Sequence, residues 1–265
     1  MKYKVRSESI KPSKIGIDSI ENAIAHVLPE VDMLKEWYKF YASEHKERLS
    51  FDIDYVREYI SAESVIIEFG AIPPILTIAL TNLGYQVCAL DIAPERFSNT
   101  ILSSGLDIRK ANIETHKLPF ESNTFHAALF NEIFEHLRIN PIETLGEVIR
   151  VLKPGGTLLL STPNLASLKG YRELIFRNKA PGNVFDEYMK LKTLGHMGHV
   201  REYTPIEVCT FLEEIGFEIR EVIFRGKTVS RSIWKGTIFN LILFFVPCLR
   251  RFFSVVATKP ASRAK

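Results

Sequence analysis

Two carboxylates and a glycine stand at the ends of the first two strongly apolar runs in the middle of the chain. Glu68 and Gly70 follow the aliphatic run 65–67, and Asp91 follows the run 86–90. A carboxylate at the carboxyl end of a parallel strand can accept hydrogen bonds from both hydroxyls of a ribose, and a glycine turn lets a ligand approach the backbone. The spacing therefore predicts a nucleoside site, although an ordinary turn between a strand and a helix could carry the same residues.

The composition of this turn distinguishes between kinds of nucleotide. A dinucleotide site needs several glycines whose N–H groups close on a pyrophosphate, but Pro73 and Pro74 have no N–H to donate. Glu68 also places a negative charge where a phosphate would lie. We therefore expect a phosphate-free, cationic nucleoside such as S-adenosylmethionine. A nicotinamide-dependent oxidoreductase is the weaker alternative.

Alternating strands and helices must bring these residues to one edge of a sheet. Apolar runs predict strands at 65–69, 86–90, 106–111, 125–130 and 157–161, and helices are predicted at 75–83 and 141–152. This order predicts an α/β fold with a doubly wound, Rossmann-like parallel sheet and helices on both faces.

The first 60 residues precede this pattern and form, by prediction, an N-terminal helical segment, followed by a main domain over 61–265. Residues 1–14 are polar and are expected to be a loose arm without a signal peptide. Three helices are then predicted, at 18–28 from the capping-box spacing of Asp18 and Glu21, at 31–46 and at 52–60.

Five motifs occur in order along the middle of the chain. They are Glu68-Phe69-Gly70, Asp91, Leu118-Pro119-Phe120, Asn131-Glu132-Ile133-Phe134-Glu135-His136-Leu137 and Leu152-Lys153-Pro154-Gly155-Gly156-Thr157-Leu158. As a set they resemble the class I S-adenosylmethionine-dependent methyltransferases, in the branch of small-molecule methylases. The resemblance covers residues 64–259. It implies a seven-stranded sheet whose last strand is antiparallel, with strand six at 217–224 and strand seven at 254–260.

The resemblance also implies roles for individual residues in binding S-adenosylmethionine. Gly70 would pass under the methionine part, Glu68 would orient its ammonium, and Asp91 would accept from the ribose hydroxyls. The adenine would contact Ile92, Asn112 and Ile113, and Asn131 would lie near the methionine carboxylate and the methyl group. The chain departs from the family where Ala71, Ile72 and Pro73 fill a turn that usually holds further glycines, and where Asn112 replaces a common aspartate.

Methyl transfer to a hydroxyl needs a base, for which histidine is the usual residue at neutral pH. His136 follows the fourth strand of the resemblance, and His196 and His199 follow the fifth, so we expect His199 and His136 to be the catalytic candidates. His126 begins a strand and is expected to be structural. Glu132, Glu135 and His136 could instead meet as metal ligands, but the motif is common in metal-free relatives, and we expect no metal.

Two further segments bear on the acceptor. An acceptor lid is predicted over 165–203, where basic residues and tyrosines suit an anionic or sugar-bearing molecule or form only a solvated surface. An apolar insert over 228–251 carries a dense apolar run at 233–249 with cationic flanks. That run could lie in a membrane interface, form an acyl pocket or a dimer face, or pack internally.

Composition limits the remaining function classes. The 265 residues carry a formal net charge of +3, which is too small to indicate a nucleic-acid partner. The three cysteines form no metal or disulfide pattern, and we expect a cytoplasmic protein, either fully soluble or peripheral to a membrane. The main hypothesis is a methyltransferase acting on a hydroxyl of a saccharide, a lipid-linked molecule or another small molecule. The alternative is a non-catalytic module that binds a partner or a membrane through the apolar insert.

Overall fold

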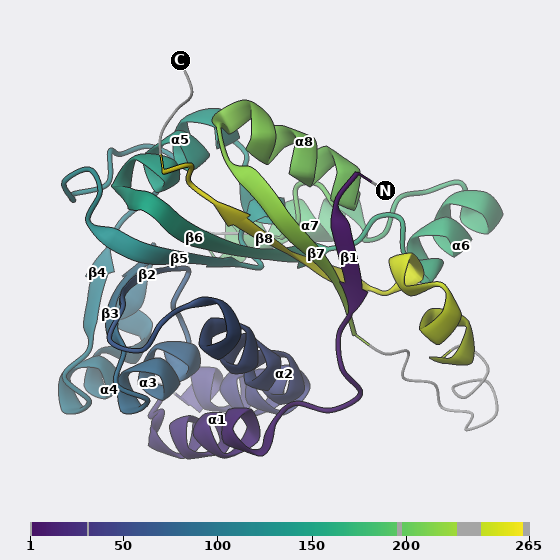
Figure 1. Cartoon of the computed structure of the whole chain (residues 1–265). Coiled ribbons are helices and arrows are strands. Elements are labelled where there is room, and N and C mark those ends of the chain that lie inside the picture. The colour runs from purple at the N-terminus through teal and green to yellow at the C-terminus, as the bar shows by residue number, and fades with distance from the viewer. Residues whose placement is uncertain (1, 31, 195–197, 227–239, 262–265) are drawn as a thin grey trace. The chain divides into compact units, whose positions relative to one another are not determined.

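The computed structural model describes residues 2–30, 32–194, 198–226 and 240–261 (Figure 1). Its strands form an eight-stranded sheet in the order β1-β7-β8-β6-β5-β2-β3-β4. The chain divides into two compact units. The first unit comprises Met1–Glu8, Asn131–Gly146 and Leu158–Pro260, and the second comprises Ser9–Phe130, Glu147–Thr157 and Ala261–Lys265. Both are described only over the ranges given above.

The second unit holds the predicted strand–turn–helix–strand pattern. β2 (Val65–Phe69) pairs in parallel with β3 (Gln86–Asp91) and with β5 (Phe125–Asn131), and β3 pairs in parallel with β4 (Asp107–Lys110). The short helix α3 (Ile75–Asn82) has its first six residues buried, which agrees with its continuous apolar sequence. η1 (Pro94–Phe97) and α4 (Ser98–Ser103) connect β3 to β4. The predicted α/β pattern is confirmed here.

The N-terminal helices differ from the prediction in their bounds. α1 is Lys14–His26, so the predicted start at Asp18 is wrong, because Ser13 is the N-cap and accepts a hydrogen bond from Gly16 N–H. α2 is one helix, Asp32–Tyr59, where two were predicted, since the intervening residues include no proline or glycine and are buried at Leu49 and Ser50. The helices approach closely at Gly16, where a Cβ would lie 2.5 Å from the Ser50 carbonyl oxygen.

In the first unit the expected loose arm is partly a strand. β1 (Lys4–Ser7) pairs in parallel with β7 (Glu218–Arg225), which pairs antiparallel with β8 (Phe252–Thr258). Ion pairs hold the arm there: Glu8 binds Arg225 at 2.8 Å and Arg6 binds Glu221 at 2.9 Å, and three of these four side chains are almost fully buried. The sheet therefore has eight strands instead of the predicted seven, while the antiparallel last strand is confirmed.

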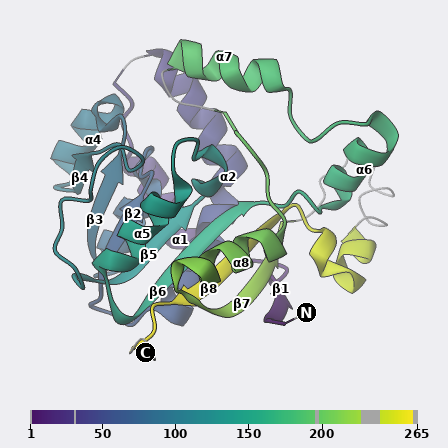
Figure 2. The ribbon, with the colours of Figure 1, turned by 90° about the horizontal axis from the view of Figure 1, so that it is seen from above.

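The remaining elements lie along the second half of the chain (Figure 2). α5 is Pro141–Val151, and β6 (Leu152–Pro163) begins five residues earlier than predicted, because Leu152 to Gly156 join the strand instead of breaking it. Two helices, α6 (Leu168–Arg177) and α7 (Val184–Leu194), occupy much of the 165–203 segment. α8 (Pro205–Ile215) begins with a capping box between Thr204 and Glu207.

Only part of the apolar insert is described by the structure. Residues 240–245 are helical and η3 (Pro247–Leu249) follows, whereas residues 227–239, including Trp234 and Ile238, lie outside the described ranges. Leu243 is buried, but Leu241, Phe244 and Phe245 are exposed. No helix in the described part of the chain is long and apolar enough to cross a membrane.

Candidate active site

The Asp91 carboxylate is fixed between two loops at the carboxyl end of β3. Its Oδ2 accepts a hydrogen bond from Ile72 N–H at 3.1 Å, and its Oδ1 accepts one from Ala93 N–H at 2.8 Å. Arg96 Nη2 lies 3.6 Å from Oδ1. The side chain is nearly buried, at 7% exposure. The backbone therefore sets the orientation of this carboxylate, whose oxygens only accept hydrogen bonds, as the predicted contact with ribose hydroxyls requires.

Gly70 turns the chain directly after β2. Its φ is +68°, a conformation that side chains other than glycine rarely adopt, and its N–H donates to the Leu90 carbonyl at 2.8 Å. The residue is exposed, whereas Ala71 next to it is buried. The backbone at Gly70 is thus open to a ligand, although only one glycine is present in the turn.

Glu68 occupies a different environment from the one that the sequence suggested. Its side chain is buried between β2 and α3, where Oε2 accepts a hydrogen bond from Thr77 Oγ1 at 2.7 Å. Burial raises the pKa of Glu68 to about 7, and the Thr77 hydrogen bond lowers it only in part. The carboxylate is therefore anchored to the helix, and its role in orienting the methionine ammonium stays a prediction.

The three residues predicted around the adenine lie on the strand ends next to Asp91. Ile92 is 36% exposed, which leaves an apolar surface for a planar ring. Asn112 is half-buried and its Oδ1 accepts from Glu114 N–H at 3.1 Å, so one lone pair of this oxygen is used within its own loop. Ile113 is half-buried. The backbone links this loop to β3 through Ala111 N–H, which donates to the Asp91 carbonyl at 2.8 Å.

The first unit gathers a second set of polar side chains. η2 (Phe134–His136) follows β5, and its Glu135 side chain is buried with Oε2 accepting from Thr162 Oγ1 at 2.8 Å. The rings of His136 and His199 meet edge to face, with centroids 5.0 Å apart. His199 Nε2 lies 4.0 Å from Glu135 Oε1. The structure therefore brings together both predicted catalytic histidines, and Glu135 joins them.

Backbone contacts hold this cluster in place. Val200 N–H donates to the Glu135 carbonyl at 2.8 Å, and His136 Nδ1 lies 3.1 Å from the Gly198 carbonyl oxygen. The backbone leaves little room for a side chain at Gly198, because a Cβ would lie 2.8 Å from Glu187 Cα. His196 lies outside the described residues. Sixty-two residues separate His136 from Gly198, so no local motif could have shown this contact.

Two residues of the long motif lie apart from this trio of side chains. Glu132 has a φ of +56°, and its Oε1 accepts from Ser161 Oγ at 2.9 Å, so this acid is oriented toward β6. Asn131 ends β5 and is half-buried. Its predicted place near the methionine end of the cofactor stays a prediction. The spacing suggested that Glu132, Glu135 and His136 could meet as metal ligands. In the structure, the potential ligand atoms that lie close together are those of Glu135, His136 and His199.

Aromatic and basic residues flank the histidines. Tyr203 packs on Phe134 with ring centroids 4.7 Å apart, and the Arg201 guanidinium lies 4.9 Å from the Tyr203 ring. Arg201 also pairs with Glu207. Burial raises the pKa of Tyr203, so its hydroxyl stays neutral and can donate a hydrogen bond. Several cations of the 165–203 segment are paired as well, for example Arg172 and Arg177 with the buried Glu173.

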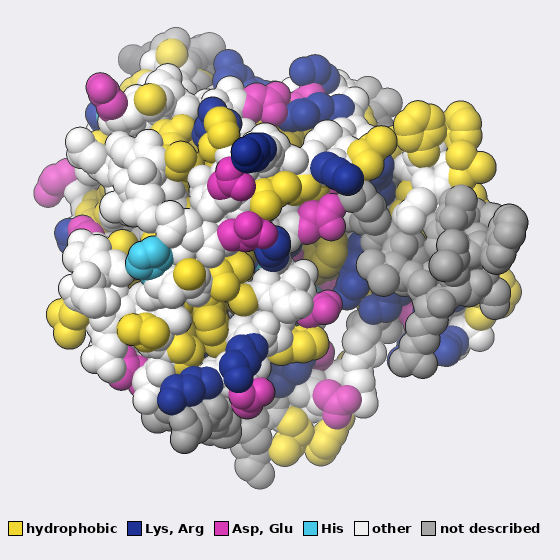
Figure 3. Space-filling model, turned by 90° about the horizontal axis from the view of Figure 1, so that it is seen from below, with side chains coloured by type: hydrophobic (Ala, Val, Ile, Leu, Met, Phe, Trp, Pro, Cys, Tyr) yellow, Lys and Arg dark blue, Asp and Glu magenta, His cyan; other side chains and the backbone are white. Residues whose placement is uncertain are grey.

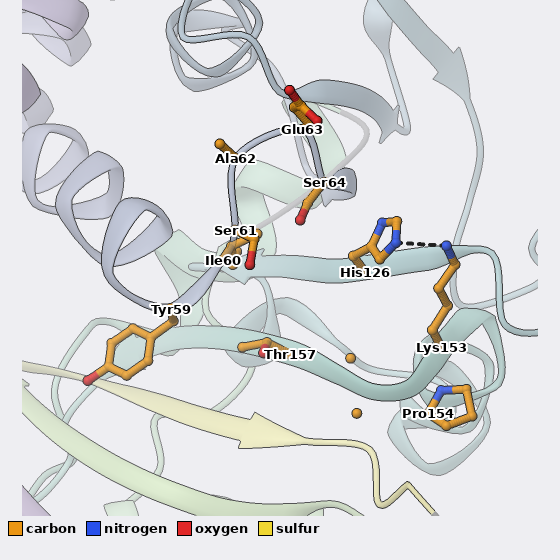
Figure 4. A pocket seen from close by; sticks show the side chains of 12 residues that line it. Tyr59, Ile60, Ser61, Ala62, Glu63, Ser64, His126, Lys153, Pro154 and Thr157 are labelled. Carbon is orange, nitrogen blue, oxygen red and sulfur yellow. Dashed lines mark hydrogen bonds between the residues drawn. The ribbon is translucent and has the colours of Figure 1, made fainter.

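His126 belongs to a separate hollow of about 470 Å³ in the second unit (Figure 4). The hollow lies at the amino ends of β2 and β5, opposite the strand ends that carry Glu68 and Asp91. His126 Nδ1 accepts from Val65 N–H at 3.0 Å and its Nε2 lies 2.8 Å from Lys153 Nζ. These contacts tie β5 to the start of β2, which supports the predicted structural role of His126.

Comparison with known proteins decides the family. A protein-family model described as a methyltransferase domain matches residues 41–222, more than half of the chain. The chain belongs to this methyltransferase family. Together with the fold, this match confirms the class I S-adenosylmethionine-dependent methyltransferase domain that the motifs resemble.

Individual relatives of this methyltransferase agree with the assignment. The ubiquinone biosynthesis O-methyltransferase of Xanthomonas campestris pv. campestris (strain B100) is 31% identical over 118 residues, covering 42% of this chain and 48% of the relative. The enzyme of the same name from Xanthomonas axonopodis pv. citri (strain 306) is 31% identical over 176 residues, covering 62% and 69%. The chain thus spans about half the length of the first of these curated relatives.

A solved structure shows the same fold. The crystal structure of a SAM-dependent methyltransferase from Archaeoglobus fulgidus matches with a TM-score of 0.54 at 15% identity, over 83% of this chain and 99% of that one. The residues of this methyltransferase also fit its cofactor. Asp91 offers a fixed acceptor for ribose hydroxyls and Gly70 an open backbone, while Pro73 and Pro74 give no N–H groups to a phosphate.

Proposed function

We propose that this methyltransferase acts on a hydroxyl of a small molecule. The observation that carries the proposal is the pairing of His136 and His199 beside Glu135, which supplies proton-accepting nitrogens of the kind that a neutral hydroxyl acceptor needs. The names of the Xanthomonas relatives, which are O-methyltransferases, support the same reaction class. S-Adenosylmethionine, when bound, supplies an electrophilic methyl group on a positively charged sulfur.

The chain's own residues divide the work of binding. Asp91 would hold the ribose, Gly70 would allow the methionine part to pass close to the backbone, and Glu68 would take the ammonium. Ile92, Asn112, Ile113 and Asn131 would complete the contacts to the adenine and the methionine carboxylate. These assignments follow the family resemblance and the positions of the side chains at the strand ends.

His199 is the proposed base. Its Nδ1 lies 3.6 Å from Glu202 Oε1 and its Nε2 lies 4.0 Å from Glu135 Oε1, so a carboxylate faces the imidazole on each side. In the tautomer with the proton on Nδ1, Nε2 holds a lone pair that can accept the hydroxyl proton. The side chain is 39% exposed, so an acceptor can reach it. His136, whose Nδ1 is held by the Gly198 carbonyl, is the second candidate.

The exposed surface of the first unit favours an acceptor with an apolar part, or one that is presented at a membrane. α6 exposes Ile175 and Phe176, α7 exposes Phe185, and Phe244 and Phe245 are exposed in the helical turn 240–245. α6 and this turn lie side by side in Figures 1 and 2. Figure 3 shows one face of the molecule, on which hydrophobic side chains lie among Lys, Arg, Asp and Glu side chains. We infer peripheral contact with an interface, while a dimer face and internal packing are the competing roles.

Acceptor screening tests the proposed function. Purified enzyme would be incubated with methyl-labelled S-adenosylmethionine and matched pairs of acceptors, each a phenol, saccharide or lipid-linked alcohol beside its deoxy analogue. Label transfer to the hydroxyl compound and not to its deoxy analogue is the expected result. Transfer only to amines or thiols would contradict the proposal.

A further inference from the structure

We propose that Glu135, His136 and His199 form a binding site for a divalent metal cation. One potential ligand atom from each residue lies within 4.8 Å of the other two. Metal–ligand bonds of about 2.1 Å place ligand atoms roughly 3–4 Å apart around one ion. Small rotations of the two imidazoles would therefore suffice to close the three atoms on a cation.

The contact of His136 with the Gly198 carbonyl sets the tautomer of its imidazole. The Gly198 carbonyl oxygen, 3.1 Å from Nδ1, can only accept, so Nδ1 carries the proton. Nε2 is then unprotonated, which is the state that a metal requires. Metal-binding histidines characteristically donate their second N–H to a carbonyl or a carboxylate in this way.

Glu135 and His199 are oriented by partners in the same manner. The Glu135 side chain is buried, Thr162 Oγ1 holds its Oε2 at 2.8 Å, and its Oε1 is the oxygen nearest to His199 Nε2. Glu202 Oε1 lies 3.6 Å from the opposite nitrogen of His199. Burying an ionised carboxylate is costly without a compensating positive charge, and a cation between Oε1 and the imidazoles would provide one.

The ligand set indicates which cations would bind. Two imidazoles and one carboxylate suit first-row transition metals and zinc, whereas magnesium and calcium prefer sites made of oxygen alone. Three protein ligands also leave coordination positions open, as in catalytic metal sites. Because His199 is 39% exposed, water or an acceptor oxygen can reach these positions.

A cation here changes the roles of the histidines in the reaction. Its part in chemistry rests on the proposed hydroxyl methylation, whereas cation binding does not. The acceptor oxygen would bind the cation, which lowers the pKa of the hydroxyl so that its proton passes to water. The oxygen then forms a bond to the methyl carbon while the carbon–sulfur bond breaks and its electron pair stays on sulfur. With a cation bound, the two histidines would serve as its ligands and the acceptor proton would pass to water, whereas without a cation His199 is the base of the proposed function.

Binding of Co²⁺ and Zn²⁺ to tag-free, chelator-stripped protein tests the site without cofactor or acceptor. Calorimetry and the visible absorbance of Co²⁺ should show one ion per chain, with Mg²⁺ much weaker. His199→Gln and Glu135→Gln should weaken Co²⁺ binding at least tenfold. His116→Gln is the matched control, because His116 is exposed and belongs to the second unit. Circular dichroism would verify that each variant folds.

The outcomes separate the two proposals. Failure of wild-type protein to bind Co²⁺ or Zn²⁺ below millimolar concentrations would overturn the cation site and leave hydroxyl methylation intact. Equal binding by the His199 and His116 variants would overturn it as well. Tight one-to-one binding that is lost in the His199 variant supports the site even if no hydroxyl acceptor is ever methylated, which would contradict only the proposed function.

Discussion

The two groups of candidate residues are assembled by different means. Around Asp91, the chain positions a carboxylate with backbone N–H groups that are 19 and 2 residues away in sequence. Around His199, Glu135 of η2 contacts Thr162 of β6 across 27 residues, and His136 contacts the segment before Tyr203 across 62 residues. The first group is a local turn motif of the fold, whereas the second depends on where a long connection places its residues.

The two groups therefore depend on different parts of the chain. The Asp91 carboxylate is held by N–H groups of the two loops beside it, at Ile72 and Ala93. A cluster that depends on the 165–203 segment can change with that segment while the sheet stays the same. We therefore expect changes near Asp91 to affect cofactor binding, and changes near His199 to affect chemistry.

The largest effect is expected from His199→Ala. Turnover should fall about 10²–10⁴-fold, because the residue that handles the acceptor oxygen is lost as a base or as a metal ligand. Affinity for S-adenosylhomocysteine should change less than twofold, since the proposed cofactor residues are others. Steady-state kinetics and calorimetry measure the two quantities separately.

His116→Ala serves as the control, because His116 is exposed and lies in the second unit. Near-normal turnover in His199→Ala would move the base to His136 or show that the acceptor needs none. A parallel loss of cofactor affinity would place His199 in the nucleoside site and remove the contrast between the two groups.

Asp91→Asn should weaken cofactor binding by roughly 2–4 kcal/mol, because a neutral amide replaces a charge-assisted acceptor for the ribose hydroxyls. Asn keeps the size of the side chain, so the Ile72 and Ala93 N–H groups retain an acceptor on one side. Calorimetric titration with S-adenosylhomocysteine gives the loss. Asp107→Asn, on the exposed neighbouring strand β4, should leave the affinity unchanged. Unaltered affinity in Asp91→Asn would exclude Asp91 from the site.

Glu68→Gln should change how stability depends on pH. Burial raises the pKa of Glu68 to about 7 from 4.5, so the folded state binds a proton more tightly than the unfolded state does. The contribution of Glu68 to the free energy of unfolding is therefore largest below pH 4.5 and decreases as the pH rises toward 7. Above pH 7 it stays constant, and the total decrease is at most about 3 kcal/mol.

The glutamine variant lacks this titration and can still accept from Thr77. In the absence of cofactor it should be more stable than wild type at pH 8 by about 1–3 kcal/mol, with a smaller difference at pH 5. Urea unfolding at both pH values measures this, and exposed Glu121→Gln is the comparison. An identical pH dependence in wild type and Glu68→Gln would show that Glu68 is solvated and ionised in the folded protein.

The sequence predicted the local parts of this architecture well. The strand at 65–69, the turn at Gly70 and the acid at Asp91 are neighbours in sequence, so apolar runs and turn residues locate them. The pairing of β1 was missed because it depends on buried ion pairs of Glu8 with Arg225, more than two hundred residues away. The sequence named His136 and His199 as catalytic candidates and grouped Glu135 with His136. It could not show that all three meet, because the segment that carries His199 contacts His136 across 62 residues.

The smallest expected effect concerns the exposed aromatic residues before β8. Replacing Phe244 and Phe245 by Ser should reduce binding to vesicles with anionic lipids about three- to tenfold, because exposed apolar side chains enter the interface while cations face the headgroups. Leu243 is buried and is left unchanged, so that the fold is not disturbed. The control pair is Leu102→Ser with Ile139→Ser, two exposed apolar residues elsewhere in the described part of the chain. Sedimentation with vesicles should show a loss for the first pair only.

If wild-type protein does not sediment at all, the aromatic residues serve a dimer or packing role, which sedimentation velocity of the same variants would detect. A membrane contact confined to these residues would place interface binding in the first unit, the same unit that holds His199, and would link where the acceptor is presented to where it reacts.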